Sequence, residues 1–554
     1  MDSSSSATER APRMRWWGWG DPQHPPMLQG SVLEELRERL GADGAPEPPV
    51  ALERVQLPEP ALRQNQIDEL QRVLGADGLS TNHATRVAHA AGRGYMDLVH
   101  LRRGQPEGAP DGVAHVHDHE QILALLELCS KSGIAVVPFG GGTSVVGGVA
   151  PVKGEHEAVI TLDLAGLSGI RAIDRESLSV TVAAGMRAAT LERELAGHGL
   201  TLGHFPQSFE YVSLGGCAAT RSAGQASTGY GRFEDLILGL RAATPAGTIE
   251  LPALPASAAG PDLRELIVGS EGTLGVIDRL TLKVARRPRT RIYQGLLFSD
   301  FESGAQMLRD LAQEDAAPTV ARLSDQAETE LTLRLAGNGF KAAATQLYFA
   351  ARRRNEGCLA ILGFEGEQEH AHRAWRHARA RAHDHGAIRL GGGAGEAWLA
   401  SRFSAPYMRD ELLTHGVMVE TLETAGCWSD LHALKAAVGG AISDALAGIG
   451  TPAIVGCHIS HLYESGASLY FTFLARMLRG REQRQWQSVK DAAGAAILAN
   501  GGTITHHHAI GRDHRRWLSE EVGVTAIAAL RSVKQQLDPA GIMNPGKLLD
   551  ATQG

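Results

Sequence analysis

The sequence predicts an α+β protein with a ligand-binding domain over residues 110–288 and a cap domain over residues 289–500. A chain of 554 residues is too long for one hydrophobic core and should divide into domains. Short strands alternate with helices in the first of these ranges, and clusters of glycine and hydroxyl residues follow the strands. Near residue 290 the pattern changes to strands separated by longer amphipathic helices. The remaining ranges are an N-terminal tail and helical region packed on the body, 1–109, and a C-terminal segment returning to the active site and first domain, 501–554.

Composition narrows the class of protein. Apolar residues make up 43% of the chain and charged residues 21%, as in soluble globular proteins. The formal net charge of −8 gives no electrostatic footprint for nucleic acid. Five widely spaced cysteines predict reduced thiols rather than a disulfide framework or a zinc site. With no apolar signal core, no run of about 18 apolar residues and no terminal Ser-Lys-Leu address, we expect a cytoplasmic protein.

The N-terminal region begins with a polar, Ser-rich stretch, 1–13, that we expect to be a disordered tail. Three tryptophans follow within four positions, and such density favours a packing plug against the body over a binding site. A helix is predicted to begin at Ser31, with Glu34 at the spacing of a capping box. Its apolar face comprises Leu33, Leu36 and Leu40.

The first domain opens with a strand over 113–117 and a helix that Asp118 and Gln121 should cap. Gly133 ends that helix, and a strand over 134–137 leads into a glycine loop. The apolar face of the helix comprises Ile122, Leu125, Leu126 and Cys129. Further strands are predicted over 159–164 and 178–182, and a helix with Leu191 and Leu195 inward over 188–197.

The glycine loop consists of Gly140, Gly141 and Gly142, followed by the hydroxyls of Thr143 and Ser144. Consecutive glycines allow positive φ and a close approach of a ligand to the backbone. Exposed peptide N–H groups beside hydroxyls form a cradle for a pyrophosphate. The spacing matches neither the dinucleotide fingerprint nor a P-loop, and taken alone it is equally compatible with an ordinary tight loop.

Two further clusters of small and hydroxyl residues favour a pyrophosphate-binding loop over an ordinary tight loop. They cover residues 203–224 and 268–277, each beside an apolar strand. One long ligand lying against a sheet would contact all three clusters. We therefore expect a large phosphorylated cofactor in the first domain.

In the cap, strands are predicted over 292–298 and 359–366, and a helix over 301–313. Residues 316–322 begin another edge strand. A helix over 370–385 carries five histidines and four arginines, most simply as a solvated face.

These motifs resemble the flavoprotein family of vanillyl-alcohol oxidase type, in which FAD lies between two α+β subdomains and a cap covers the isoalloxazine. Many members attach the flavin through a histidine in or after the glycine loop. Here the loop reads Gly-Gly-Gly-Thr-Ser, so the resemblance implies noncovalent FAD. The implied cofactor contacts are Pro138, Phe139, Gly140, Gly141, Gly142, Thr143, Ser144, His204, Gln207, Ser208, Ser213, Thr220, Arg221, Ser222, Ala223, Glu271, Gly272, Thr273, Leu274, Gly275, Val276 and Ile277.

A narrower resemblance, over residues 14–550, is to the alkylglycerone-phosphate synthase family. It rests on Trp-x-Gly-Trp-Gly near the N-terminus, Gly-Gly-Gly-Thr-Ser-Val at 140–145, Thr-Arg-Ser-Ala-Gly at 220–224, Tyr-x-x-Gly-Ala-x-x-Tyr-Phe at 463–471 and a His triplet. It implies ether-lipid synthesis, with the acyl chain of 1-acyl-dihydroxyacetone phosphate exchanged for a long-chain fatty alcohol. The family's route runs through a flavin–substrate adduct with no net redox. A bacterial homodimer in peripheral contact with the membrane is also implied.

Tyr470 is, by this resemblance, the general acid/base. On a strand Tyr470 and Thr472 share one face while Phe471 and Phe473 take the other. A free tyrosine titrates near pH 10, so the role needs a site that favours phenolate or a relay partner. A half-buried core tyrosine is the alternative that the residues alone favour.

The triplet His506, His507 and His508 should alternate on an extended backbone, with His507 facing away from the other two, so we expect no metal there. We expect the imidazoles to donate to the substrate phosphate or ketone and to tune Tyr470. The resemblance also assigns Arg409 to phosphate binding, and Thr421 and Arg322 to the active site, with His204 near the flavin. Taken singly, each arginine would more often form a surface ion pair.

The main alternative is an FAD-dependent D-2-hydroxyacid dehydrogenase or oxidase, which shares the FAD domain but has a metal site. Seven residues after His458 and His461 stand Ser465 and Ser468 rather than histidine, and Thr505 rather than glutamate precedes the triplet. The sequence thus lacks that metal site. A flavin-binding protein without catalysis would leave Tyr470 and the triplet unexplained.

Overall fold

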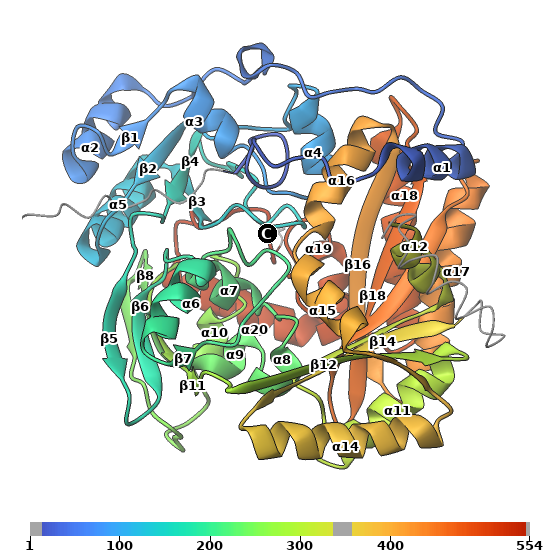
Figure 1. Cartoon of the computed structure of the whole chain (residues 1–554). Coiled ribbons are helices and arrows are strands. Elements are labelled where there is room, and N and C mark those ends of the chain that lie inside the picture. The colour runs from blue at the N-terminus through green and yellow to red at the C-terminus, as the bar shows by residue number, and fades with distance from the viewer. Residues whose placement is uncertain (1–13, 336–356, 550–554) are drawn as a thin grey trace, which may run out of the picture.

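The computed structural model describes residues 14–335 and 357–549, and the strands in these ranges form four sheets. The two larger sheets of the first domain lie in the blue-to-green half of Figure 1, and the cap sheet lies in the yellow-to-orange half. Within the described ranges, none of the helices combines the length and apolar character needed to cross a bilayer. The predicted tail over 1–13 and the chain's last residues, 550–554, lie outside the described residues.

A four-stranded sheet carries the glycine loop. Its order is β1-β2-β4-β3, and β4 pairs in parallel with both β2 and β3. The Asp118 carboxylate accepts from the Gln121 N–H at the start of α5, and Gly133 ends the helix at φ 62°, as predicted. The elements are α2 (Gln64–Leu74), β1 (Leu79–Ser80), β2 (Gly112–His115), α5 (His119–Ser132), β3 (Ile134–Phe139) and β4 (Ala158–Asp163).

The second subdomain is a five-stranded antiparallel sheet of order β5-β6-β10-β8-β9. Helix α6 buries Leu191 and Leu195 against it, as the sequence predicts. The elements are β5 (Ile170–Asp174), β6 (Ser179–Ala183), α6 (Ala188–Gly197), β7 (Leu200–Thr201), α7 (Leu214–Thr220), α8 (Ser227–Tyr230), α9 (Phe233–Leu236), β8 (Ile237–Thr244), β9 (Gly247–Leu251), α10 (Arg264–Ile267), β10 (Val276–Lys283) and β11 (Ala285–Arg286).

The cap contains a seven-stranded antiparallel sheet of order β15-β12-β14-β13-β17-β18-β16. The prediction of an edge strand at 316–322 is wrong, because β13 lies between β14 and β17 and buries Val320 and Leu323. The strands are β12 (Thr290–Phe298), β13 (Val320–Ser324), β14 (Cys358–Gly366), β15 (Ile388–Gly391), β16 (Val417–Cys427), β17 (Ile454–Leu462) and β18 (Gly466–Arg476).

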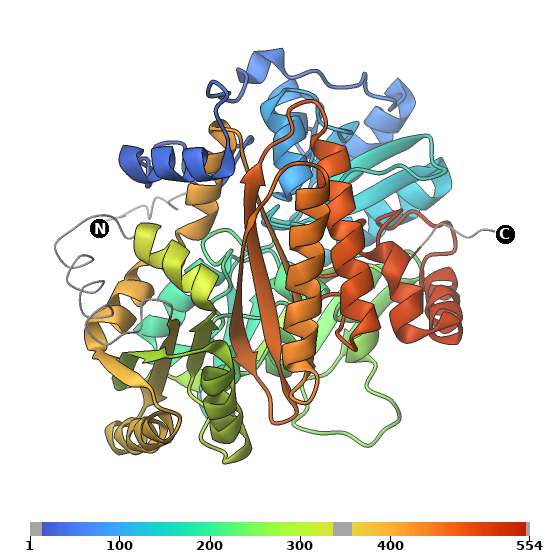
Figure 2. The same cartoon turned by 90° about the vertical axis from the view of Figure 1, so that its right-hand side faces the viewer.

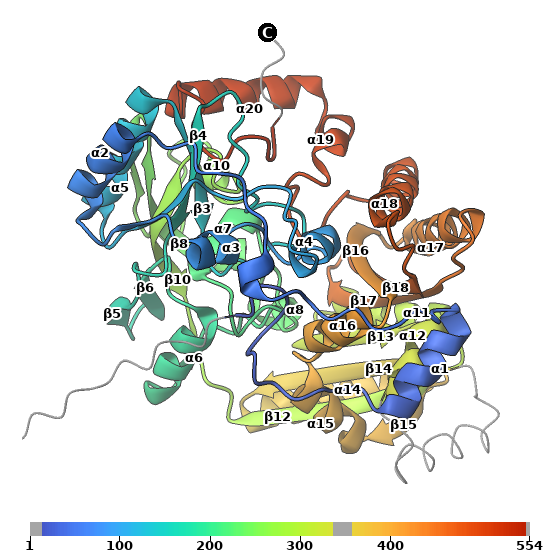
Figure 3. The same ribbon diagram turned by 90° about the horizontal axis from the view of Figure 1, so that it is seen from above.

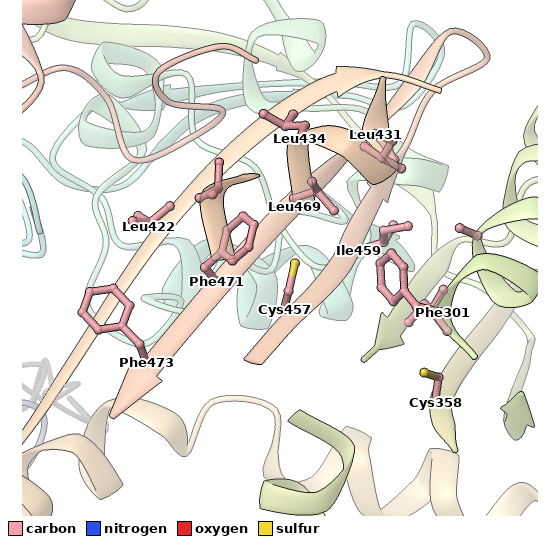
Figure 4. Close-up of a cluster of buried hydrophobic side chains, with 14 of the residues drawn as sticks. Phe301, Cys358, Leu422, Leu431, Leu434, Cys457, Ile459, Leu469, Phe471 and Phe473 are labelled. Carbon is pink, nitrogen blue, oxygen red and sulfur yellow. The ribbon is translucent and has the colours of Figure 1, made fainter. Parts of the chain in front are cut away.

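Four long helices, α11, α14, α17 and α18, cover one face of this sheet. Figures 2 and 3 show α17 and α18 along its β16–β18 side. Figure 4 shows the core beneath them, where Phe471 and Phe473 of β18 meet Leu434 and Leu469. These helices leave the opposite face of β18, which carries Tyr470, uncovered. The cap helices are α11 (Phe301–Gln313), α12 (Gln326–Leu335), α14 (Gln368–Asp384), α15 (Gly392–Ser401), α16 (Ala405–Thr414), α17 (Leu431–Gly448) and α18 (Glu482–Ala499).

The N-terminal segment joins the two domains. Helix α1 begins at Gly30, not Ser31, so Ser31 lies inside the first turn and cannot form the predicted capping box. The predicted tryptophan plug is present: Trp19 is buried edge-on against Tyr211, with ring centroids 5.4 Å apart. The remaining elements here are α1 (Gly30–Leu40), η1 (Leu52–Arg54), α3 (His83–Ala88) and α4 (Tyr95–Arg102).

The C-terminal segment returns to the first domain through α19 (Arg515–Val522) and α20 (Val524–Leu537), red in Figure 1. Met543 forms a parallel bridge with Val136 of β3. The Asn544 amide donates to the carbonyls of Gly148 and Glu271 at 3.1 and 2.7 Å. This contact ties the glycine loop to the third cluster. The boundaries at residues 110, 289 and 501 stay a prediction.

Candidate active site

A cavity of about 400 Å³ lies between the first domain and the functional face of the cap sheet. This volume is within the range of roughly 300–1,000 Å³ typical of ligand pockets. We call the part contributed by residues 138–277 the cofactor wall and the part contributed by residues 320–508 the cap wall. All three glycine clusters reach the cofactor wall, so the structure brings together what the sequence presents separately.

The glycine loop presents its backbone to the cavity. A Cβ at Gly141 would lie 2.1 Å from the Tyr211 carbonyl oxygen, so only glycine fits there. Of the three glycines only Gly142 has positive φ, at 66°, and Gly140 and Gly141 serve close approach instead. The N–H groups of Gly141, Gly142 and Thr143 donate to no residue in the described part of the chain. Three successive unpaired donors form an anion-binding concavity that fits a pyrophosphate.

Buried polar atoms without partners mark the second cluster. Gln207 Nε2 and Gln225 Oε1 are both buried and unpaired, although the two side chains approach through their other amide atoms at 3.3 Å. A buried amide atom without a partner costs free energy unless a ligand satisfies it. These atoms, both in the cavity wall, fit the hydrogen-bonding edges of a flavin.

Glu271 is the acidic residue of the third cluster, and it lines the cavity. Its carboxylate accepts from the N–H groups of Ile510 and Gly511 at 2.8 and 2.7 Å. Burial raises the pKa of Glu271 to about 7, although both N–H groups lower it. At neutral pH this acid of the cofactor wall is therefore divided between its neutral and anionic forms.

Most of the predicted cofactor contacts line the cavity. They are Pro138, Gly140, Gly141, Gly142, Thr143, Ser144, Gln207, Ser208, Ser213, Thr220, Ser222, Ala223, Glu271, Gly272, Gly275, Val276 and Ile277. Five others do not line the cavity, because each side chain has another partner, and their contact with the cofactor stays a prediction. They are Phe139, His204, Arg221, Thr273 and Leu274.

The physical reasons differ among these five. Phe139 packs against His89, and Leu274 is in the hydrophobic core. The Thr273 hydroxyl donates to the Ser270 carbonyl, and the Arg221 guanidinium forms an ion pair with Glu265. His204 lies behind Ser222, 3.2 Å from its hydroxyl, where burial lowers the pKa of His204 to about 3.

On the cap wall, Tyr470 lines the cavity while its neighbours Phe471 and Phe473 are buried on the opposite face, as predicted. Its ring lies between two imidazoles, 4.9 Å from His458 and 6.0 Å from His507, with interplanar angles of 24° and 23°. Burial raises the pKa of Tyr470 to about 12, and the Thr421 hydroxyl only partly offsets this. Of the two conditions set above, the site does not favour phenolate, so the side chain is a neutral phenol and its role requires a relay partner.

The histidine triplet curls around one carboxylate. Glu423, which pairs with Tyr470 across the sheet, accepts from the N–H groups of His506, His507 and His508. This turn replaces the predicted alternation. His507 and His508 both line the cavity. His506, also expected in the active site, lies behind them and does not reach the cavity.

The charge state of this group is set by burial. Burial alone would raise the pKa of Glu423, but the imidazoles and the Thr505 hydroxyl hold it well below its usual value. Burial lowers the pKa of His506 and His507 well below 6.5 and also lowers that of His508. The carboxylate is anionic, and burial opposes protonation of the three rings around it.

Two arginines of the cap wall face the cavity. Arg409 of α16 donates through Nη1 to the Arg93 carbonyl at 2.8 Å, whereas its Nε and Nη2 are buried without a hydrogen-bond partner. Nη2 also lies 3.6 Å from Oδ1 of Asp410, an ion pair too long for a hydrogen bond, so two adjacent donors remain to match a phosphate or carboxylate. Arg322 is already paired, with Glu328 and with His458 Nε2 at 3.1 Å.

Sequence reasoning missed Glu423, His458 and Glu328. Glu423 stands two positions after Thr421, so strand alternation alone places both on one face. The ring of His458 is fixed because its Nδ1 lies 2.9 Å from Glu328. Burial also lowers the pKa of His458, so the ring beside Tyr470 is neutral.

Three histidine nitrogens, one each from His461, His506 and His507, lie within 4.8 Å of one another. Hydrogen bonds already engage both ring nitrogens of His461, with Gly224 and with Ser460. Both nitrogens of His506 are engaged as well. We therefore assign no metal to this cluster.

Comparisons with known proteins agree with this geometry. The family model described as "FAD binding domain" matches residues 110–251, and "FAD linked oxidases, C-terminal domain" matches residues 287–548. Alkyldihydroxyacetonephosphate synthase of Trypanosoma brucei brucei is 31% identical, over 98% of this chain and 93% of that protein. The Dictyostelium discoideum enzyme of the same name is 30% identical, over 97% and 93%. A solved alkyldihydroxyacetonephosphate synthase superposes with a TM-score of 0.82 at 28% identity, covering 96% of this chain and 98% of that one.

Proposed function

The chain belongs to the alkyldihydroxyacetonephosphate synthase family, and from that premise we propose that it exchanges the acyl chain of 1-acyl-dihydroxyacetone phosphate for a long-chain fatty alcohol. The products are alkyl-dihydroxyacetone phosphate and a fatty acid, so the enzyme is an FAD-dependent alkyl transferase of ether-lipid synthesis. One observation carries the proposal. An arginine with two unpaired donors and a neutral phenol share a cavity whose other wall fits FAD.

FAD would be held by the glycine loop at its pyrophosphate and by Gln207 and Gln225 at its polar ring edge. When bound, it supplies an electron-accepting ring system beside the substrate. The cap wall supplies the rest. Arg409 binds the substrate phosphate, since a guanidinium fork matches phosphate better than a point charge does.

Tyr470 carries the proton at the first carbon of the dihydroxyacetone unit. A phenol with a pKa near 12 is protonated at neutral pH, so it must pass its own proton to a neighbouring group as it takes one from that carbon, and it returns the carbon's proton later. The stacked, neutral imidazoles of His458 and His507 hold the ring in place. His507 and His508 supply neutral ring nitrogens at the reacting end of the cavity.

The test is exchange of a radiolabelled fatty alcohol into acyl-dihydroxyacetone phosphate by purified, FAD-loaded protein. We expect labelled alkyl-dihydroxyacetone phosphate and an equal amount of fatty acid, with no electron acceptor added. Bleaching of the flavin by a D-2-hydroxy acid, with no exchange, would instead identify a dehydrogenase.

We further propose that the FAD is noncovalent, because the glycine loop contains no histidine or cysteine. Acid precipitation should release all of the yellow colour into the supernatant. Colour retained in the pellet would contradict this.

A cytoplasmic homodimer in peripheral contact with the membrane is also proposed. The five unpaired cysteines support a reducing compartment, and exposed Leu254, Leu263 and Leu266 support contact with lipid. Sedimentation of the protein alone tests the homodimer, and sedimentation with liposomes tests the contact with the membrane. The bacterial origin expected above stays a prediction.

A further inference from the structure

The proposed exchange releases one proton in each turnover. The O–H bond of the alcohol breaks as its oxygen bonds to the first carbon of dihydroxyacetone phosphate. The bond from that carbon to the acyl oxygen breaks, and the fatty acid leaves as a carboxylate, because carboxyl groups ionise well below pH 7. The alcohol proton therefore has to leave the cavity.

A chain of ring atoms leads away from that cavity. His507, which lines it, places Nδ1 2.9 Å from Nδ1 of His506. His506 in turn places Nε2 2.6 Å from the Tyr463 hydroxyl. Tyr463 is half-buried and is followed by the exposed residues Glu464 and Ser465.

We propose that His507, His506 and Tyr463 form a proton relay that carries the alcohol proton from the cavity to solvent. The assignment rests on the proposed function, which supplies the proton. Each imidazole has two nitrogens and can accept a proton at one while releasing one from the other. The Tyr463 hydroxyl likewise accepts one proton as it releases another, so it never needs to be a phenolate.

The surroundings fit a relay. Burial lowers the pKa of both imidazoles, so each passes a proton on rather than holding it. Glu423 fixes their spacing through the peptide N–H groups, and Arg232 donates to the His506 carbonyl at 2.9 Å. Arg232, Glu234 and Asp235 face Tyr463 at the outer end, where Arg232 pairs with Glu234 at 2.7 Å.

This arrangement also explains why His506 does not reach the cavity. A residue that only bound substrate would have to line the cavity, whereas the middle member of a relay has to contact a ring on each side. His506 contacts His507 and Tyr463 through opposite ring nitrogens.

The experiment compares Tyr463→Phe with the wild type and with Tyr230→Phe as a matched control. Tyr230 is also half-buried and uses its hydroxyl for one bond, to Glu365 at 2.9 Å, away from the relay. Exchange of labelled alcohol and release of protons to a pH dye are measured in weak buffer, with and without added imidazole. FAD content and thermal stability are recorded for each protein.

We expect Tyr463→Phe to lower kcat about tenfold with KM unchanged, less than the roughly 10²–10⁴-fold loss of a direct acid–base group. Imidazole should raise the rate of Tyr463→Phe, because a diffusible base can take the proton from His506, and should leave the wild type and Tyr230→Phe unchanged. His506→Gln, which keeps a polar atom but cannot pass a proton, should lower kcat without responding to imidazole.

Equal kcat and equal lack of response to imidazole in wild type, Tyr463→Phe and Tyr230→Phe would overturn the relay while the exchange activity stands. Absence of exchange in the wild type would overturn the proposed function, and the relay with it.

Discussion

The cofactor wall meets the cavity with peptide groups, small hydroxyls and amides, whereas the cap wall meets it with two arginines, imidazoles and a phenol. The first is built mainly from loops at the ends of strands, and the second from one face of a continuous sheet together with α16 and the histidine triplet. Loops can bring the backbone itself to a ligand, as at Gly141, where a side chain would not fit. A strand face can hold only side chains, but it holds them at fixed spacing.

This difference separates binding from chemistry. The cofactor wall offers donors with no protonation state to control, apart from Glu271. The cap wall offers ionisable groups whose protonation is set by burial, and its strand β18 is anchored by Phe471 and Phe473 on the other side. Changes in the two walls should therefore have separable effects on cofactor content and on turnover.

The largest effect is expected on the cap wall. Tyr470→Phe removes only the hydroxyl and should lower kcat by roughly 10²–10⁴-fold with FAD content unchanged. Steady-state kinetics on flavin-loaded protein measure this. Tyr293→Phe, which loses a hydroxyl bonded to Glu365 elsewhere in the cap, is the control. Near wild-type turnover by Tyr470→Phe would assign the proton to another group.

On the cofactor wall, Gly141→Ala should reduce FAD affinity by more than about tenfold, because the new Cβ meets the Tyr211 carbonyl oxygen. Titration of apoprotein with FAD gives the affinity. Gly197→Ala, at the end of α6 where a Cβ meets nothing within 4 Å, should bind FAD normally. Equal affinity in both variants would show that the loop does not hold the pyrophosphate closely.

Arg409→Lys keeps the charge and loses the two-pronged geometry, so KM for acyl-dihydroxyacetone phosphate should rise roughly tenfold. FAD content should not change. Arg241→Lys provides the control, because its guanidinium grips Asp278 in the first domain. An unchanged KM would mean that the phosphate binds elsewhere.

The smallest effect concerns the one titrating group of the cofactor wall. Glu271, with a pKa raised to about 7, is mostly neutral below that pH and becomes anionic above it. A carboxylate near the pyrophosphate site repels it, so FAD affinity should weaken about threefold as pH rises from 6 to 8. Fluorescence titration should show this change in wild type and not in Glu271→Gln. A flat wild-type profile would place the acid too far from the phosphates.

Local rules were enough for much of the fold. Asp118 and Gly133 mark the ends of α5, and alternation along β18 assigns Tyr470 and Phe471 to opposite faces. The shape of the histidine triplet could not be predicted from local sequence, because Glu423, more than eighty residues earlier, dictates it through three peptide N–H groups. The protonation of Tyr470 escaped prediction for a related reason: burial, a property of the assembled cavity, outweighs any neighbour in sequence.

The return of the C-terminal segment has a consequence for the assembly of the chamber. Residues 507 and 508 complete the cap wall, and Asn544 ties the third cluster to Gly148, just after the glycine loop. Val136 exchanges backbone hydrogen bonds with Ile542 and Asn544 across some four hundred residues of chain. The chamber is therefore complete only when the C-terminal segment has docked on the first domain, so its integrity depends on contacts between the two ends of the fold.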